Sequence, residues 1–375
     1  MGATKRSGGV VAVAGVVGAL GAGGAQAIDL PADTAEAMVH LYNGGGTKAY
    51  GPAFLVRKSM ADRVSVSGEY FVDMVSNASI DVVTTASPYK ETRNEFDLGL
   101  DYVVRDTLIH ASGSASREPD YDANTFGLDL TQDTFGGMTT VTLGFTKGSD
   151  KVGQKGVGFF DTAQHWQWRV GATQVLTPRW VASANLEVVA DSGFLGSPYR
   201  VARVFGATVP ESMPRTRESR ALKLGFVGDI TPAAAEQGGE PSRRSVYGDY
   251  RYFWDTWGVR AHTLEGGYRR YFGTNWVADG FVRLYKQDHA LFYSDDAQTP
   301  TIYLTRNRQL STFHDASVGA QVTYTLKDVP GQYNVKLDGS YQFMAFRYND
   351  FTDIRTGKAY SFDAHVLELV MTANF

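Results

Sequence analysis

Charged side chains recur at every second position along several segments of this chain. After Val64, for example, Glu69 and Asp73 share one face, while aliphatic and aromatic residues occupy the other. Rings of charged side chains select ions where they line a water-filled passage. The same pattern is also typical of structural salt bridges on a solvated wall, and both interpretations stay open. We call the charged face that would line such a passage the inner wall. It has eleven carboxylates, Glu69, Asp73, Glu95, Asp97, Asp101, Glu187, Asp249, Glu265, Asp279, Asp338 and Glu368, and six bases, Arg169, Lys223, Arg251, Arg269, Arg283 and Lys336. Neighbours on one strand, such as Asp249 and Arg251, Asp279 and Arg283, or Lys336 and Asp338, could pair.

Catalysis would require a nucleophile beside a base, and the sequence offers only a weak arrangement of this kind. His110 shares a strand face with Ser112 and Ser114. Residues two apart on a strand point the same way, so this spacing does not establish a nucleophile–base hydrogen bond. The histidines near predicted strand ends have no H-x-x-x-H metal spacing. We therefore predict no enzyme activity, no catalytic residues, no cofactor and no metal site.

Four arginines and one glutamate, Glu211, give residues 192–217 a local charge of 4 − 1 = +3. Glycines let this segment bend, and its apolar residues favour burial of one side. We predict that it folds back toward the acidic wall, where its arginines pair with carboxylates and narrow the passage. The alternative is a mobile surface loop. The candidate constriction residues are Arg200, Arg203, Arg215 and Arg217.

A hydrophobic period of two predicts the elements that hold these side chains. Phe96, Leu98 and Leu100 alternate with Asp97 and Asp101, and similar alternation recurs through most of the chain. This pattern indicates strands with one apolar and one polar face. No linker rich in Pro and Ser and no long helical apolar period interrupts it. The simplest fold is one continuous all-β domain.

Aromatic residues at the ends of the apolar face favour a membrane barrel over a soluble sandwich. A sandwich buries its largest aromatics centrally, whereas outer-membrane barrels place them in two belts at the headgroup level. One predicted rim contains Tyr102, Trp180, Trp276, Tyr324 and Tyr333, and the other contains Tyr70, Trp166, Tyr250, Tyr252 and Trp254.

The connections give the strand count. Tight turns near residues 61–62, 105–106, 177–178, 273–274 and 328–331 alternate with longer loops near residues 77–92, 148–162, 192–216 and 290–309. Outer-membrane barrels have short periplasmic turns and longer external loops. The chain in a strand at residues 49–57 must then run from the cell exterior toward the periplasm. This direction requires an earlier strand, at residues 36–42, that runs from the periplasm toward the exterior. We predict a transmembrane antiparallel up-and-down β-barrel of sixteen strands, or fourteen if either weak N-terminal strand is lost.

The N-terminus has the order of a secretory signal peptide. Lys5 and Arg6 precede an apolar run at residues 10–22, and a small-residue site, Ala-Gln-Ala, ends at Ala27. The run is shorter than the roughly 20 residues that a spanning helix needs. We predict cleavage after Ala27, so that residues 1–27 are the signal peptide and residues 28–375 form a single barrel domain. The chain has no cysteine, which excludes a lipid-anchoring cysteine and disulfides.

The C-terminus places Leu367, Leu369, Met371 and Phe375 on one face. Such an ending resembles the assembly signal of bacterial outer-membrane proteins, which implies recognition by the barrel assembly machinery. The usual signal has a second aromatic residue two positions before the last one, where this chain has Ala373.

Three stretches carry a further resemblance: RVSVSGEYFVDMVS at residues 63–76, SPYKETR at residues 87–93 and YFWDTWGVRAHTLE at residues 252–265. They resemble a proteobacterial family known only as a domain of unknown function, number 3570. The resemblance covers nearly the whole mature chain. It implies an exported, barrel-like protein of the outer membrane of a Gram-negative bacterium, and it assigns no activity and no functional residues.

Composition limits the classes of function. The net charge is −4 and the pI about 6.0, with scattered basic residues, so nucleic acid is not an expected partner. The expected partners are outer-membrane lipid and the barrel assembly machinery, while a homo-oligomer is an analogy from fold alone. The sequence identifies no solute and no protein partner. We predict an outer-membrane pore or transport channel with a charged lumen; a scaffold or receptor barrel for a periplasmic or extracellular partner is the alternative, ahead of a barrel-wall hydrolase.

Overall fold

The computed structural model describes residues 28–77, 89–154, 156–232 and 242–375. The predicted signal peptide at residues 1–27 lies outside the described residues, and its cleavage stays a prediction. Within the described part of the chain, no helix has the length and apolar character needed to cross a membrane, a finding that carries no information about strands.

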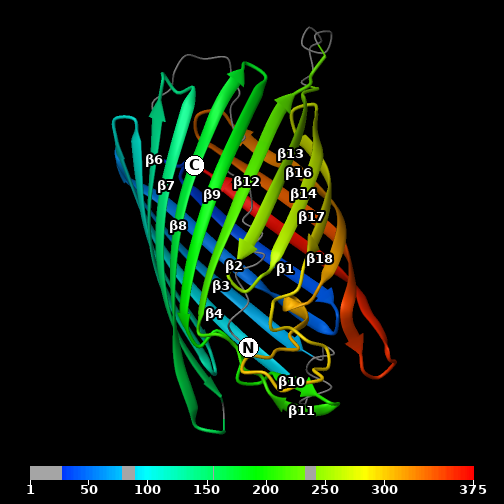
Figure 1. Cartoon of the computed structure of the whole chain (residues 1–375). Coiled ribbons are helices and arrows are strands. Elements are labelled where there is room, and N and C mark those ends of the chain that lie inside the picture. The colour runs from blue at the N-terminus through cyan, green and yellow to red at the C-terminus, as the bar shows by residue number, and fades with distance from the viewer. Residues whose placement is uncertain (1–27, 78–88, 155, 233–241) are drawn as a thin grey trace.

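Sixteen strands form one closed barrel, and each is antiparallel to its neighbours in the sequence (Figure 1). β1 pairs with β18 and thereby closes the ring. The prediction of a sixteen-stranded antiparallel barrel is confirmed, and the presence of both N-terminal strands excludes fourteen. The barrel strands are β1 (Thr34–Gly44), β2 (Thr47–Ala61), β3 (Val64–Asn77), β4 (Tyr89–Val104), β5 (Thr107–Glu118), β6 (Tyr121–Thr134), β7 (Thr139–Gln154), β8 (Phe159–Thr177), β9 (Trp180–Gly193), β12 (Thr216–Asp229), β13 (Arg244–Asp255), β14 (Arg260–Phe272), β15 (Trp276–Gln287), β16 (Phe313–Val329), β17 (Tyr333–Asp353) and β18 (Lys358–Asn374).

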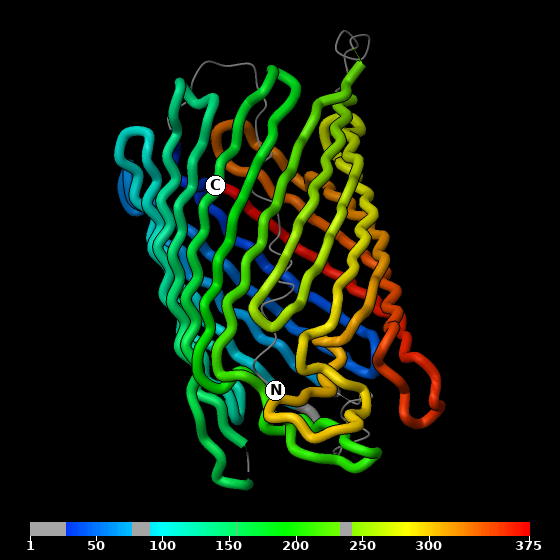
Figure 2. The backbone as a smooth tube through the Cα atoms, viewed as in Figure 1, coloured from blue at the N-terminus to red at the C-terminus, as the bar shows by residue number. Residues whose placement is uncertain are grey.

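Two smaller elements lie outside the barrel sheet. β10 (Val201–Val204) and β11 (Ala207–Pro210) form a separate hairpin, and η1 (Arg308–Leu310) is a short 3-10 helix. Both belong to long connections, at residues 194–215 and 288–312, on the same end of the barrel (Figures 1 and 2). We call this the loop end and the opposite end, which holds Thr34 and Phe375, the terminal end.

Connections at the terminal end are mostly tight, as between β4 and β5, where Arg105 has a positive φ of 54°. The connection from β12 to β13 at residues 230–243 is longer, and residues 233–241 of it are not described. The predicted loops at residues 192–216 and 290–309 agree with the observed connections within three residues at each end. The predicted loop at residues 148–162 is wrong, because β7 continues to residue 154 and β8 begins at residue 159.

The outer face of the barrel is apolar, as the period of two predicts. Leu98, Leu100, Leu222, Leu224 and Val318 are among its exposed side chains. Aromatic pairs mark the terminal end, where the rings of Trp276 and Tyr324 lie 4.4 Å apart. Apolar surface of this kind is stable where hydrocarbon rather than water surrounds it.

Asp33, just before β1, contacts the end of β18, the strand that closes the ring, at the terminal end of the barrel. The backbone N–H of Phe375 donates to the carbonyl of Asp33 at 3.0 Å. The Asp33 carboxylate accepts the N–H of Ser59 at 2.6 Å and lies 2.6 Å from Lys58 Nζ, which stands 4.9 Å over the Phe375 ring. The ammonium of Lys58 and the bonds from Ser59 lower the pKa of Asp33 to about 2. Leu367, Leu369 and Met371 are exposed on the outer face.

Candidate functional site: the charged inner wall and its cap

All seventeen charged residues predicted for the inner wall lie on barrel strands, at positions that alternate with the outward aliphatic side chains. On β4, for example, Asp97 and Asp101 alternate with the exposed Leu98 and Leu100. Lys223 has the same placement on β12. The side chains therefore face the barrel interior, because successive residues of a strand point to opposite faces.

Most ion pairs on this wall join different strands, whereas Arg93 and Glu95 pair within β4. Lys223 Nζ lies 3.2 Å from Asp249 Oδ2, Arg269 Nε lies 3.0 Å from Asp279 Oδ2, and Arg251 Nη2 lies 3.9 Å from Glu187 Oε1. Lys336 and Asp338 also do not pair with each other, since Asp338 accepts hydrogen bonds from Gln321 and Thr323 on β16. Facing residues on adjacent strands are about 5 Å apart, closer than residues i and i+2 on one strand.

Two histidines are held by carboxylates of the wall. His110 Nδ1 lies 2.6 Å from Asp101 Oδ1, and Asp101 is only 2% exposed. His165 lies between two carboxylates, with Nδ1 2.7 Å from Asp191 and Nε2 2.8 Å from Asp150. These contacts give both rings a structural function in the sheet.

Opposite sides of the interior differ in charge. In the ring of sixteen strands, β3 lies eight strands from β13 and β4 lies eight strands from β14, so these two parts of the wall face each other across the interior. Arg93 on β4 brings a positive charge to the part of the wall formed by β3 and β4, and its guanidinium lies 3.5 Å from the Glu95 carboxylate. The acidic sector on β1, β3 and β4 contains Glu36, Glu69, Asp73, Glu95, Asp97 and Asp101, which with Arg93 sum to −5. The mixed sector on β12–β15 contains Lys223, Arg251, Arg269 and Arg283 with Asp249, Glu265 and Asp279, which sum to +1.

A cap lies at the loop end, and we define it as residues 194–215 together with residues 288–312 (Figures 1 and 2). The two segments are joined by short β-bridges, Val204 with Ala297 and Ser212 with Leu304. The N–H of Leu304 donates to the carbonyl of Ser212 at 2.8 Å. The two segments therefore form one connected unit.

The base of the cap is an apolar cluster above β13 and β14. Trp257, Val259, Ala290 and Leu310 are buried together, and Leu195 packs against them. Trp257 Nε1 donates to the carbonyl of Thr216 at 2.8 Å. This cluster attaches both cap segments to the same part of the rim.

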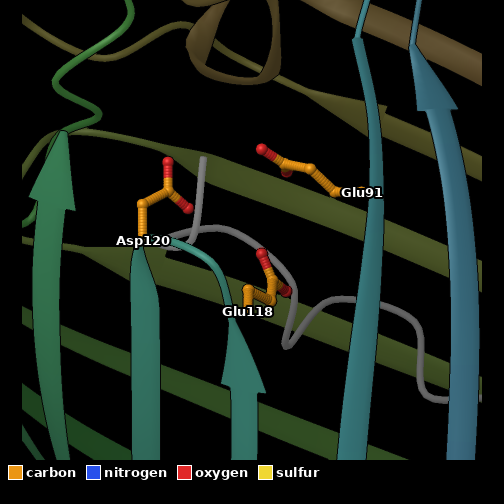
Figure 3. A group of neighbouring side chains, drawn as sticks. All are labelled: Glu91, Glu118 and Asp120. Atoms are coloured by element: carbon orange, nitrogen blue, oxygen red, sulfur yellow. The ribbon is translucent and has the colours of Figure 1, made fainter. Parts of the chain in front are cut away.

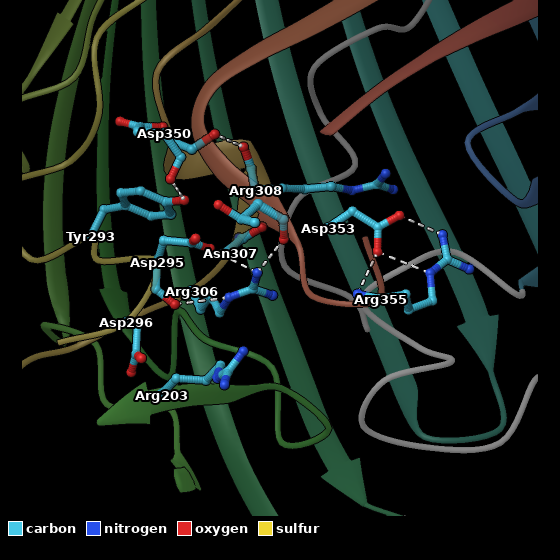
Figure 4. A network of polar contacts seen from close by, with 12 residues as sticks. Arg203, Tyr293, Asp295, Asp296, Arg306, Asn307, Arg308, Asp350, Asp353 and Arg355 are labelled. Carbon is cyan, nitrogen blue, oxygen red and sulfur yellow. Dashed lines mark hydrogen bonds and ion pairs between the residues drawn. The ribbon is translucent and has the colours of Figure 1, made fainter. Parts of the chain in front are cut away.

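Arg306 joins the cap to β17, as Figure 4 shows. Its side chain is 7% exposed and lies 4.3 Å over the ring of Phe351. Its Nη2 lies 2.7 Å from an Asp295 carboxylate oxygen and donates to the carbonyl of Thr352 at 2.6 Å. Nearby, Tyr293 donates to the carbonyl of Asp350 at 2.9 Å, and burial raises the pKa of Tyr293 above its ordinary value.

The four arginines proposed for the constriction occupy different places. Arg215 makes an exposed bidentate pair with Asp161 at the end of β8, at 2.7 and 2.9 Å. Arg217 belongs to β12 rather than to the loop, and it pairs with the buried Asp255 at the end of β13. Arg203 donates to the carbonyl of Gly206 at 3.3 Å, within the hairpin turn. The Arg200 carbonyl accepts the N–H of Glu211 at 3.4 Å.

The far edge of the cap reaches the turn between β5 and β6. There the hydroxyl of Tyr199 donates to the Asp120 carboxylate. Asp120 also gathers with Glu91 and Glu118, their carboxylate oxygens within 4.8 Å of one another (Figure 3). Oxygen ligands of this type suit calcium, and no metal ligand was predicted here because Glu91 is distant in the sequence from Glu118 and Asp120. Through Tyr199 and Arg306 the cap spans from β5–β6 to β17.

Sequence reasoning missed several polar residues of the wall and rim. Arg57 pairs with Asp101, and Arg169 Nη2 lies 2.6 Å from Asp129. Alternation could have found Arg57, between Val56 and Lys58 on β2, and Asp129 on β6. No local pattern marks Asp255, Asp161 or Arg306, since their partners are set by the folded rim.

A family model matches most of the chain, at residues 22–160 and 154–342, and its description is "Protein of unknown function (DUF3570)". The chain belongs to this family. The family prediction is confirmed, and membership adds no activity. The sequence matches none of the curated proteins.

Solved structures with a similar fold include a bacterial polysaccharide outer membrane secretin, with 8% identity and a TM-score of 0.51 over 91% of this chain and 98% of that one. CdiB from Acinetobacter baumannii has 8% identity and a TM-score of 0.50, with coverage of 91% and 60%. At such low identity the likeness concerns the fold alone.

Proposed function

We propose that this protein is an outer-membrane channel with a charged aqueous lumen and an extracellular cap that limits passage. The observation that carries the proposal is the cap, which bridges the loop end of a closed barrel with a polar inner wall. No enzymatic step is part of the proposal.

Three features support a place in the outer membrane. The outer face is apolar with aromatic residues toward its ends, the turns at the terminal end are mostly tight, and the last strand ends in an outward phenylalanine. A closed barrel satisfies every backbone group between strands, which is what hydrocarbon requires. We assign the terminal end to the periplasm and the loop end to the cell exterior. The barrel assembly machinery is the partner expected for insertion.

The inner wall supports transport of small hydrophilic solutes or ions. Sixteen strands leave room for an aqueous passage. A charged solute in the lumen would have an acidic sector on one side and a nearly balanced sector on the other. Fixed charges at close range affect which ions enter, so the net acidic wall favours cations.

Reconstitution into planar bilayers tests the proposal. Purified, heat-modifiable protein should give discrete conductance steps with a modest cation preference, and the steps should be small or intermittent because the cap covers the mouth. Folded protein that stays silent at all voltages, with and without the cap, would contradict a channel and favour the scaffold or receptor alternative. Hydrolysis of lipid in the same preparation would favour an enzyme instead.

A further inference from the structure

Two arginines face each other on the outer wall near the terminal end. Arg244 on β13 and Arg270 on β14 are register partners across the two strands. Arg270 lies on the same strand face as the exposed Tyr268 and Phe272, two residues from each, and Arg244 lies on the same face as the exposed Tyr250. Both side chains therefore leave the barrel on the lipid-facing side.

Nothing in the described protein neutralises this pair. The Nε atoms of Arg244 and Arg270 are buried and have no hydrogen-bond partner among the described residues. Their cross-strand neighbours on the same face are Ile230, before β13, and Ala278 on β15, which bring no negative charge. Like charges directly opposite on a sheet are destabilising. An anion between the two guanidinium groups would remove that repulsion and satisfy both Nε atoms.

The surroundings specify what kind of anion fits. Phe272, 4.7 Å from the Arg270 guanidinium, and the Trp276–Tyr324 pair belong to the aromatic belt at this end. Such belts lie at the headgroup level of a bilayer. Facing residues on paired strands are about 5 Å apart at Cβ, so two arginine forks can hold one phosphate group from both sides.

An apolar groove lies on the outer face of the same strands, farther toward the middle of the barrel than the arginine pair. Gly248 and Gly266 are register partners, and each lies four residues along its strand from Arg244 or Arg270. That separation corresponds to about 13 Å. The groove has a volume of about 530 Å³, and its apolar lining includes Phe226, Tyr250, Leu264, Val282 and Leu284. A phosphate at the arginines and an acyl chain in the groove match the two ends of one phospholipid.

We propose that Arg244 and Arg270 bind the phosphate of an anionic phospholipid in the periplasmic leaflet, with an acyl chain of that lipid in the groove at Gly248 and Gly266. This inference rests on the membrane placement proposed above and not on conductance. The guanidinium fork is matched to phosphate geometry, and a lysine at either position would lose the bidentate contact.

Native mass spectrometry of the detergent-solubilised barrel tests the site with dioleoylphosphatidylglycerol and dioleoylphosphatidylcholine as probes. The wild-type chain should retain phosphatidylglycerol preferentially, because the choline group brings a positive charge to the arginines. Each basic residue near a membrane surface contributes about 1 kcal/mol, so Arg244→Gln or Arg270→Gln should weaken phosphatidylglycerol binding about fivefold and the double variant about 25-fold. Arg270→Lys should fall between the wild type and Arg270→Gln.

Arg220→Gln is the matched control, because Arg220 also faces outward on β12 but already pairs with Glu218 at 3.2 Å. This variant should bind phosphatidylglycerol as the wild type does. Gly266→Leu tests the acyl-chain groove independently and should weaken lipid binding with the arginines intact. Heat-modifiable gel mobility establishes that each variant is folded.

Inorganic phosphate distinguishes the two sources of the anion. At millimolar concentration it should not displace the lipid; displacement of the lipid, with no effect of Gly266→Leu, would identify a free-phosphate site and overturn the lipid assignment. Equal phosphatidylglycerol retention by wild type and the folded double variant would overturn the site altogether. If the barrel proves to be a silent, non-conducting membrane protein, the lipid result is unaffected, so the two proposals fail separately.

Discussion

Arg217 holds the buried carboxylate of Asp255 with two hydrogen bonds to one oxygen, 2.8 Å from Nε and 2.6 Å from Nη2. The other oxygen of Asp255 accepts the N–H of Val259 at 2.8 Å. The ring of Trp257 lies 4.6 Å from the guanidinium. This pair therefore connects β12, the β13–β14 turn and the apolar base of the cap.

Replacing Arg217 with Gln should destabilise the barrel markedly, because Asp255 would keep a buried charge without its partner. Loss of one member of a buried ion pair costs roughly 3 kcal/mol or more. Arg215→Gln is the matched control, since the Arg215–Asp161 pair is exposed and pairs of that kind contribute about 1 kcal/mol at most. Urea unfolding followed by tryptophan fluorescence measures both. Equal losses in the two variants would contradict the structural role of the buried pair.

Tyr199→Phe should loosen the far edge of the cap, because it removes only the hydroxyl that donates to Asp120. A single hydrogen bond contributes about 1 kcal/mol, so the open fraction should rise about fivefold. Single-channel recording measures the open fraction directly. Tyr303→Phe, at an exposed cap position, is the control and should leave gating unchanged. An unchanged open fraction in Tyr199→Phe would mean that this edge does not hold the cap closed.

Leu369→Asp should block assembly, whereas Val370→Asp should not. Leu369 is 51% exposed on the outer face of β18, and the adjacent Val370 points inward. Only the first aspartate would meet hydrocarbon, at a cost that depends on depth. Deletion of Phe375 should also reduce assembly, since its N–H bonds Asp33 and its ring contacts Lys58. Surface levels and gel mobility provide the measurement; normal levels of Leu369→Asp would refute the strand register.

Asp33 gives a dependence on pH. Its folded pKa is lowered to about 2, below the ordinary value near 3.9, so its stabilising contribution is complete above pH 4 and is lost as the pH falls through 2. Asp33→Asn should therefore lower the urea midpoint at pH 7, and the difference from wild type should shrink between pH 4 and pH 2. A difference in urea midpoint that does not change with pH would show that the charge of Asp33 does not stabilise the pairing of β1 with β18.

Alternation predicted the strands wherever one face meets lipid and the other water. The method failed at residues 148–162, where Ser149, Lys151 and Thr162 are exposed at outward positions. Both faces are polar there, so backbone pairing continues after the hydrophobic signal has ended. The register of paired strands also decides which side chains meet across the sheet. Lys223 faces Arg251 and pairs with Asp249, two residues away from that position on β13, which could not be read from same-strand spacing.

The cap was predicted only in part. Its charge and apolar residues indicated that residues 192–217 fold back, and Arg215 and Arg217 do pair with carboxylates, but at the rim. The second segment, residues 288–312, gave no comparable signal. Arg306 is buried because Asp295, Phe351 and Thr352 meet around it, and that arrangement exists only after the barrel has closed.

Shortening the first segment of the cap allows a direct test of the proposed function. Gly196 lies near Met213, so residues 196–212 can be deleted and replaced by a short glycine link. Arg200→Gln combined with Arg203→Gln is the control, because it removes the same arginines and leaves the cap in place.

Single-channel conductance and reversal potential of this deletion variant, measured in planar bilayers under a salt gradient, test the central claim most directly. We expect larger conductance steps than in the wild type and a shift toward cations, because the uncovered wall is acidic. The arginine control should show a smaller shift in selectivity and no increase in conductance. Unchanged conductance and ion preference in the folded deletion variant would place the cap outside the conducting path and contradict the account.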